Sequence, residues 1–159
     1  MSNHLYDAVF APHEMSEKAF LISNTQSLSY AAFHKRVNQL AHALVASGMQ
    51  TGDRVAVQAA KSNTQLALYV ATIKAGGVYL PLNTSYTAHE PDYFISNAAA
   101  RLVVVDERAE AAVSPIAAAQ GASLLTLNAD ESGTLTALAD SQADQFEAVP
   151  RGAEDLAAI

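Results

Sequence analysis

The sequence predicts an α/β fold in which helices flank a mostly parallel sheet. The first observation is a set of short, wholly apolar runs, such as residues 102–105, which are typical of strands covered on both faces. The second is a set of longer stretches whose apolar residues recur every three or four positions, which indicates amphipathic helices. The two patterns alternate along a chain of 159 residues, so we expect βαβ units within one domain that is large enough to bury a core.

The composition excludes several classes of protein. With 50% hydrophobic and 16% charged residues, the chain is globular rather than disordered. Its net charge of -7 leaves no basic face to neutralise phosphates. Cysteine is absent, which excludes disulfides, thiolate metal sites and a cysteine nucleophile. The N-terminus lacks a signal-peptide pattern and no stretch reaches about 18 apolar residues. We therefore expect a soluble, cytoplasmic protein without nucleic-acid or membrane partners.

The clearest local signal is a switch from helix to strand within residues 73–83, which read I-K-A-G-G-V-Y-L-P-L-N. Four apolar residues before the switch share one helical face: Leu66, Tyr69, Val70 and Ile73. Lys74 then stands in the last turn, where a cation suits the helix dipole. Either Gly76 or Gly77 is expected to end the helix in the left-handed conformation, because glycine has no Cβ to clash there. A buried strand should follow at 78–82.

The N-terminal part is expected to contain a short helix within residues 1–18 and then a hairpin. The apolar run at 19–22 and the run at 27–29 flank a polar turn at 24–26. In that turn Asn24 tolerates a positive φ.

Helices and strands then alternate. Ser29 is expected to cap a helix over 30–47 that Gly48 closes, and a second helix should cover 63–75. Strands sharing one largely parallel sheet are expected at 54–58, 78–82, 102–105 and 123–127.

Two further helix starts are predicted from local signals. Residues 87–90 have the spacing of a capping box and should open a helix that runs through 94–95. Ser114 and Pro115 read as the N-cap and first residue of a short alanine-rich helix that ends at Gly121.

The sequence divides into three parts. Residues 1–127 form the α/β portion. Residues 128–152 are rich in Asp, Glu, Ser and Gln and are predicted to be a polar connector, with one or two helical turns around Leu135 and Leu138. Residues 153–159 begin to resemble a further strand.

Few residues have the setting of a chemical site. The glycine pair at 76–77 lacks the third glycine and the following helix of a phosphate-binding loop, so a helix end is favoured. Lys61 and Ser62 follow a strand at a helix N-terminus, which favours anions, but without nearby glycines a capping serine and a solvated lysine are preferred. Asp106 and Glu107 lie where α/β proteins bind ligands, although acids that begin a helix commonly complement its dipole.

The other polar residues favour structural interpretations. Five histidines have no metal-ligand spacing: His4, His13, His34, His42 and His89. No serine has a nucleophile motif. Four acids are predicted to form a solvated surface: Asp130, Glu131, Asp140 and Asp144. The loop at 83–86 leaves the carboxyl end of the central strand and is predicted to be a structured turn with Tyr86 packed over the core.

Several of these segments resemble motifs of a known superfamily. Residues 73–83 resemble the second core motif of the adenylate-forming enzymes, which include acyl-CoA synthetases, luciferases and peptide-synthetase adenylation domains. The run L-S-Y-A-A-F at 28–33 resembles the first core motif. Residues 83–87 and 92–95 look most like malonyl-CoA synthetases. In that family the strand expected at 155–159 leads into the third core motif, a phosphate loop, and the chain ends before it.

The resemblance implies a ligase that works in two steps. ATP and a dicarboxylate, most simply malonate, would give an acyl-adenylate and pyrophosphate with Mg²⁺, and CoA would then displace AMP, a reaction of fatty acid metabolism. The family's positions for these roles lie outside this stretch, so no catalytic, cofactor-binding or metal-binding residue is assigned.

The resemblance also implies that this stretch is an N-terminal fragment. Alone it would be inactive, would hold no ligand and would need the remainder of the same enzyme as its partner. Apolar surface that the missing part covers would favour self-association. Two alternatives stay open: a fragment of another acyl- or aryl-CoA ligase, or a small non-catalytic α/β binding module.

Overall fold

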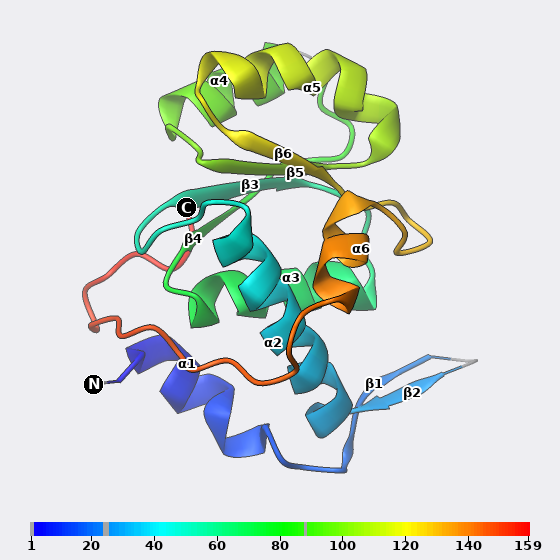
Figure 1. Cartoon of the computed structure of the whole chain (residues 1–159), viewed down its shortest axis with the longest axis vertical. Coiled ribbons are helices and arrows are strands. Elements are labelled where there is room, and N and C mark those ends of the chain that lie inside the picture. The colour runs from blue at the N-terminus through cyan, green and yellow to red at the C-terminus, as the bar shows by residue number, and fades with distance from the viewer. Residues whose placement is uncertain (1, 24–25, 88) are drawn as a thin grey trace.

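A wholly parallel four-stranded sheet with the order β4-β3-β5-β6 lies at the centre of the molecule (Figure 1). The computed structural model describes residues 2–23, 26–87 and 89–159. The strands are β3 (Arg54–Gln58), β4 (Val78–Pro81), β5 (Leu102–Val105) and β6 (Ser123–Thr126). Each strand lies within a range that the sequence predicts, so the α/β class and the shared parallel sheet are confirmed.

Both faces of the sheet are covered by helices. Helices α2 (Tyr30–Ala46), α3 (Asn63–Lys74) and α6 (Thr134–Asp140) lie on one face, and α4 (His89–Asn97) and α5 (Glu107–Ala119) lie on the other (Figure 1). In β3, Val55 and Val57 belong to one apolar core and Ala56 belongs to the other. All four residues of β5 are at most 1% exposed. The continuous apolar runs in the sequence follow from this burial on both faces. None of the described helices is both long and apolar enough to cross a membrane.

Helices α2 and α3 begin at the predicted caps. The Ser29 hydroxyl accepts a hydrogen bond from the N–H of Ala32 at 3.2 Å, and α2 follows. The Ser62 hydroxyl accepts one from the N–H of Gln65 at 3.0 Å at the start of α3. Both serines satisfy backbone donors that have no partner inside the helix. The structure therefore confirms the capping serine at residue 62.

The structure corrects the predicted start of helix α5. The helix begins at Glu107, well before Ser114 and Pro115, which the sequence indicated as its start. Its N-cap is Asp106, whose carboxylate accepts a backbone hydrogen bond at 3.0 Å from the first turn. Pro115 lies inside the helix on an exposed side, where water can reach the carbonyl of Ala111 that has lost its N–H partner.

Two predicted turns lie partly outside the described residues. At the start of α4 the N–H of Thr87 donates to the Glu90 carboxylate at 3.0 Å, as a capping box requires, whereas Ala88 is outside the described ranges. The predicted hairpin is confirmed as an antiparallel pair. Its strands are β1 (Ala19–Ile22) and β2 (Ser27–Ser29). The turn residues Asn24 and Thr25 are also outside the described ranges.

The N-terminal segment forms the expected short helix and packs on the α2–α3 layer. It consists of α1 (His4–Val9) and a single 3₁₀ turn, η1 (Ala11–His13). Tyr6 is 1% exposed and belongs to the core that α2 and α3 build. Figure 1 shows α1 below α2 and α3, at the end of the molecule farthest from α4 and α5.

The polar stretch 128–152 contains α6, which confirms the helical turns expected around Leu135 and Leu138. Leu135 and Ala139 are fully buried against the first layer. The chain then returns past α1 towards β4 (Figure 1), and the N–H of Val149 donates to the Lys74 carbonyl at 2.8 Å.

The last residues pair with the free edge of β4. The N–H of Tyr79 donates to the Ala157 carbonyl at 2.9 Å, and the N–H of Ile159 donates to the Tyr79 carbonyl at 3.1 Å. The bridge between Tyr79 and Ala158 is parallel, so this segment runs in the same direction as the rest of the sheet.

The switch from α3 to β4 depends on Gly76. Its φ is +79°, a left-handed conformation, while Gly77 lies outside that region. The N–H of Gly77 donates to the Thr72 carbonyl at 2.8 Å, and the N–H of Gly76 donates to the Ile73 carbonyl at 3.0 Å. This pair of hydrogen bonds is the one that defines a Schellman motif. A Cβ on Gly76 would meet Val149 Cγ1 at 2.8 Å.

We expect Gly76→Ala to lower the free energy of unfolding by more than about 1 kcal/mol, because the side chain is strained at positive φ and also clashes. Gly48 is a matched control: it ends α2 at a φ of +98° with no atom within 4 Å of a built Cβ. Gly48→Ala should cost only the strain, on the order of 1 kcal/mol. Urea unfolding of both variants measures the difference, and equal losses would contradict the proposed clash with Val149.

Candidate functional site at the carboxyl edge of the sheet

The strand order defines where a ligand crevice is expected. β3 is the first strand of the parallel sheet along the chain, β4 lies on one side of it and β5 on the other. The connections that leave β3 and β5 therefore diverge: the first leads to α3 on one face of the sheet and the second to α5 on the other. Open α/β sheets bind ligands at this switch point.

A cavity of about 470 Å³ opens at the switch point. It is lined by Gln58, Ala60, Thr84, Tyr86, Asp106, Arg108 and Ala109. The structure thus brings together two features that the sequence singled out, the loop at 83–86 and Asp106. A second, more open cavity of about 390 Å³ continues along the same edge and includes Glu107.

Gln58 fixes the shape of this crevice, and the sequence analysis missed it. Its side chain is 6% exposed, and its amide donates to the carbonyls of Asn83 at 3.0 Å and Tyr86 at 3.1 Å. The Asn83 side chain accepts from the N–H of Ser85 at 2.9 Å, and the Tyr86 ring stacks on Phe94 at 5.5 Å between ring centroids. The predicted structured turn, with Tyr86 packed over the core, is confirmed. The signal in the sequence that could have identified Gln58 is its polar amide side chain at the end of the apolar strand 54–58.

Asp106 is held as an ionised cap. Its carboxylate is 2.8 Å from Arg108 Nε, and the hydrogen bond from this guanidinium, joined by the one from the Arg108 N–H, keeps the pKa of Asp106 below its usual range. A carboxylate in this state complements the dipole of α5 and is poorly suited to take up protons near neutral pH.

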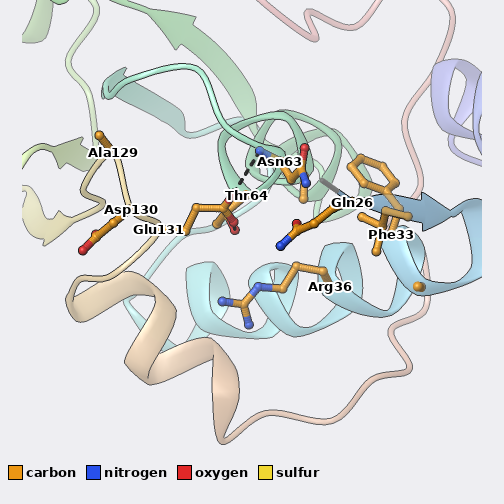
Figure 2. A pocket seen from close by; sticks show the side chains of 11 residues that line it. Gln26, Phe33, Arg36, Asn63, Thr64, Ala129, Asp130 and Glu131 are labelled. Atoms are coloured by element: carbon orange, nitrogen blue, oxygen red, sulfur yellow. Dashed lines mark hydrogen bonds between the residues drawn. The ribbon is translucent and has the colours of Figure 1, made fainter. Parts of the chain in front are cut away.

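The N-terminus of α3, the second candidate for an anion site, already holds a carboxylate of the chain itself. Glu131 accepts from the N–H of Asn63 at 3.2 Å and from the Thr64 hydroxyl (Figure 2). Lys61 is exposed and forms no part of this contact. Glu131 was expected on a solvated surface, and the structure corrects this: it serves as a long-range helix cap.

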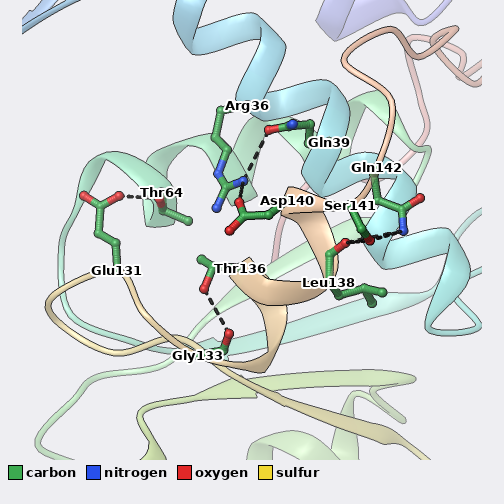
Figure 3. A network of polar contacts seen from close by, with 10 residues as sticks. All are labelled: Arg36, Gln39, Thr64, Glu131, Gly133, Thr136, Leu138, Asp140, Ser141 and Gln142. Carbon is green, nitrogen blue, oxygen red and sulfur yellow. Dashed lines mark hydrogen bonds and ion pairs between the residues drawn. The ribbon is translucent and has the colours of Figure 1, made fainter.

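A cavity of about 600 Å³ lies beside Glu131 (Figure 2). Several of the polar side chains that line it are bonded to other residues of the chain. Arg36, on α2, pairs with Asp140 of α6 at 2.7 Å (Figure 3). In the same network the Thr136 hydroxyl donates to the Gly133 carbonyl at 3.0 Å. Gly133 has a φ of +137°, and a Cβ there would lie 2.3 Å from the Thr126 carbonyl oxygen. The loop that carries Glu131 is thus closely packed against the end of β6 at Gly133.

The remaining candidates are not at this edge. Gly76 and Gly77 precede β4 and therefore lie at the amino edge of the sheet. Of the histidines, His34 is buried, and His42 donates to the Gln145 carbonyl at 2.8 Å. Within the part of the chain that the structure describes, no three or more His, Asp or Glu side chains are grouped so that they could hold a metal ion.

The fold and the motifs belong to one enzyme family. The chain is a member of the AMP-binding enzyme family, whose model matches residues 10–159. The structure of ATP-bound MatB from Rhodopseudomonas palustris is similar along 99% of this chain, with 43% identity and a TM-score of 0.95. This chain covers 32% of the MatB chain. The resemblance of the sequence motifs to adenylate-forming enzymes is confirmed.

Two curated relatives extend the comparison. Malpibaldin synthetase of Mortierella alpina is 33% identical over 94 residues, which are 59% of this chain and 2% of the synthetase. The fatty acid–[acyl-carrier-protein] ligase ScoC of Streptomyces coeruleorubidus is 30% identical over 117 residues, 74% of this chain and 22% of the ligase. The chain therefore spans only a small part of the length of the curated relatives it matches.

We expect Glu131→Ala to destabilise the fold by about 1–2 kcal/mol, because the donors of Asn63 and Thr64 lose their acceptor. Alanine at this position keeps the same backbone φ of +68°, so the strain is unchanged and the measurement isolates the carboxylate. Glu147→Ala, at an exposed glutamate, is the matched control and should change the unfolding free energy by less than about 0.5 kcal/mol. Chemical denaturation that gives equal effects for the two variants would refute the capping role.

Proposed function

We propose that this chain is the first part of the large N-terminal domain of an AMP-forming acid–thiol ligase, and that the acid is malonate. In the proposed reaction, malonate and ATP give malonyl-adenylate and pyrophosphate, and CoA then displaces AMP to give malonyl-CoA. The observation that carries the proposal is the 43% identity along 99% of this chain to MatB, a malonyl-CoA synthetase. The motif at residues 73–83 and the membership of the AMP-binding family support the adenylating half-reaction.

In this proposal the chain supplies framework, and no residue of it is assigned to catalysis. The crevice at the switch point is held by Gln58 and Asp106, whose polar groups are bonded within the chain. Two donors at the N-terminus of α3 that could bind a phosphate, the Asn63 N–H and the Thr64 hydroxyl, are taken by Glu131. The described residues also lack a carboxylate cluster that fits Mg²⁺. ATP, CoA and Mg²⁺ are accordingly proposed as substrates and cofactor of the longer enzyme.

The partner we propose is the remainder of the same enzyme. Residues 157–159 already extend the sheet beyond β4, so further strands would continue along that edge. Leu156 and Ile159 are 59% and 53% exposed, which gives this edge an apolar surface for the rest of the domain to cover.

The full reading frame that contains this chain should release AMP when malonate, ATP and CoA are all present, and the 159-residue chain should not. Adenylyl transfer needs positioned donors around the triphosphate, and the loss of one such donor already costs about 10²- to 10³-fold in rate. The measurement is AMP release by both proteins, with malonate omitted as the blank. AMP formation by the short chain would place the chemistry in residues that we assign to the framework, and an inert full-length protein would remove the ligase assignment.

A substrate panel tests the malonate proposal separately. Malonate should give a higher kcat/KM than acetate, octanoate or benzoate with the full-length protein. A site that pairs with the second carboxylate of malonate loses this interaction when the substrate is a monocarboxylic acid. A preference for octanoate or benzoate would keep the ligase class and replace the substrate by a fatty or aryl acid. Holo acyl carrier protein serves as a second thiol in the panel, since ScoC is a fatty acid–[acyl-carrier-protein] ligase.

A further inference from the structure

A polar cluster joins the N-terminal segment to helices α2 and α3. Its members Tyr6, His34 and Lys74 are buried, and the fourth, Glu14, has a side chain that is 33% exposed. At the centre of the cluster is Lys74, the lysine of the helix-to-strand switch, whose side chain is 4% exposed. Its ammonium lies 2.7 Å from Glu14 Oε1, donates to Asn38 Oδ1 at 2.7 Å, and sits 4.7 Å from the centre of the Tyr6 ring. A lysine so deeply placed needs its counter-charge, because an unpaired buried charge is strongly unfavourable.

The hydrogen bonds of the cluster have a defined direction. The Tyr6 hydroxyl has one proton and donates it to the Glu14 carboxylate. The Tyr6 oxygen must therefore accept at its contact of 3.1 Å with His34 Nδ1, so this nitrogen carries the imidazole proton. His34 is 3% exposed and Tyr6 is 1% exposed. The hydrogen bonds run from His34 on α2 to Tyr6 on α1 and on to Glu14, the residue after η1. Lys74, at the end of α3, donates to the same Glu14 carboxylate.

This cluster is the main polar attachment of the N-terminal segment to the helices beneath it. Among the described residues from 4 to 15, the hydrogen bonds that reach α2 and α3 come from Tyr6 and Glu14. The rest of the contact is apolar, for example Phe10 against Tyr69 with ring centroids 6.5 Å apart. At its ends the segment is tied by Asn3, which donates to the Ile73 carbonyl at 2.9 Å, and by Ser16, whose carbonyl accepts from Ala31 at 2.9 Å.

We propose that Tyr6, Glu14, His34 and Lys74 form an acid-sensitive latch that holds residues 4–15 against helices α2 and α3. In the closed latch one carboxylate balances one ammonium and the imidazole is neutral. Protonation of His34 adds a second cation to a buried cluster that contains a single anion. Release of residues 4–15 hydrates both cations and removes this conflict.

The surroundings of His34 in the closed latch disfavour its protonation, as the proposal requires. Burial lowers the pKa of His34, the charges of Lys74 and His13 lower it further, and only Glu14 opposes them. Burial alone would raise the pKa of Glu14, but hydrogen bonds from Lys74 and Tyr6 hold it below its usual range. Both groups are therefore protonated more readily in the open state than in the closed one. The latch is fully closed above the ordinary histidine pKa of about 6.5 and weakens as pH falls below it.

Hydrogen exchange on the full-length protein tests the latch. Protection factors, corrected for the intrinsic exchange rate at each pH, are compared at pH 7.5 and pH 5.5. If His34 stays neutral in the closed state, the opening constant of residues 4–15 rises by up to about tenfold at one pH unit below 6.5. Protection in β3 and β5 should not change. A parallel loss in these strands would mean global acid unfolding and would overturn the proposal.

Two variants separate the roles of the groups. His34→Gln keeps an N–H donor for Tyr6 and cannot become charged, so the acid dependence of residues 4–15 should disappear. His89→Gln, at an exposed histidine on α4, is the matched control and should behave as the unmodified protein does. Glu14→Gln leaves Lys74 without its counter-charge and should open residues 4–15 already at pH 7.5. Unchanged acid dependence in His34→Gln would overturn the latch.

A measurement without any substitution covers the case in which a variant does not fold. The imidazole of His34 is titrated by NMR in the unmodified protein. The latch requires the His34 midpoint to lie below the ordinary histidine pKa of about 6.5, as burial of the imidazole lowers its pKa. A midpoint at or above about 6.5 would mean that the closed cluster accepts the added charge, and the proposal would fail.

Discussion

The burial of the parallel sheet on both faces is the constraint on which the rest of the structure depends. Parallel neighbours cannot be joined by tight turns, so each connection must cross over as a helix and cover one face. Two cores result, and residues such as Ala56 and Val57 alternate between them. Each buried valine or leucine contributes about 1.5–3 kcal/mol, which offsets the cost of ordering the connecting loops. The strands tolerate few polar residues, so the buried polar groups lie at the strand ends and between the helices.

The two edges of the sheet have different roles. At the amino edge, Gly76 turns α3 into β4 and places the polar residues of the α3 end against the N-terminal segment. At the carboxyl edge, Gln58 and Glu131 satisfy the loops and the helix start from within the chain. The polar groups at both edges are therefore bonded within the chain before any ligand is considered. Such preorganisation is what the proposed role of this chain as a framework requires.

Features encoded by neighbouring residues could be predicted from the sequence, and those that join distant residues could not. The four strands and the caps at Ser29 and Ser62 depend on local periodicity and short-range hydrogen bonds, so they were visible. Helix α5 was misplaced because Ser114 and Pro115 imitate a helix start, while the true signal was the acid at 106. The acidic partner of Lys74, Glu14, is 60 positions away and the partner of Glu131, Asn63, is 68 positions away, so no pattern around either residue indicated its role.

The pairing of residues 157–159 with Tyr79 bears on the order in which the molecule is assembled during synthesis. As the chain leaves the ribosome, β3 to β6 can form while the outer side of β4 still has unpaired backbone groups. Such an open edge is a template for strands of other nascent chains until residues 157–159 arrive to occupy it. The arrival of residues 157–159 thus ends the period in which the outer side of β4 is open to aggregation, and the length of that period is set by the residues that separate β4 from this late partner.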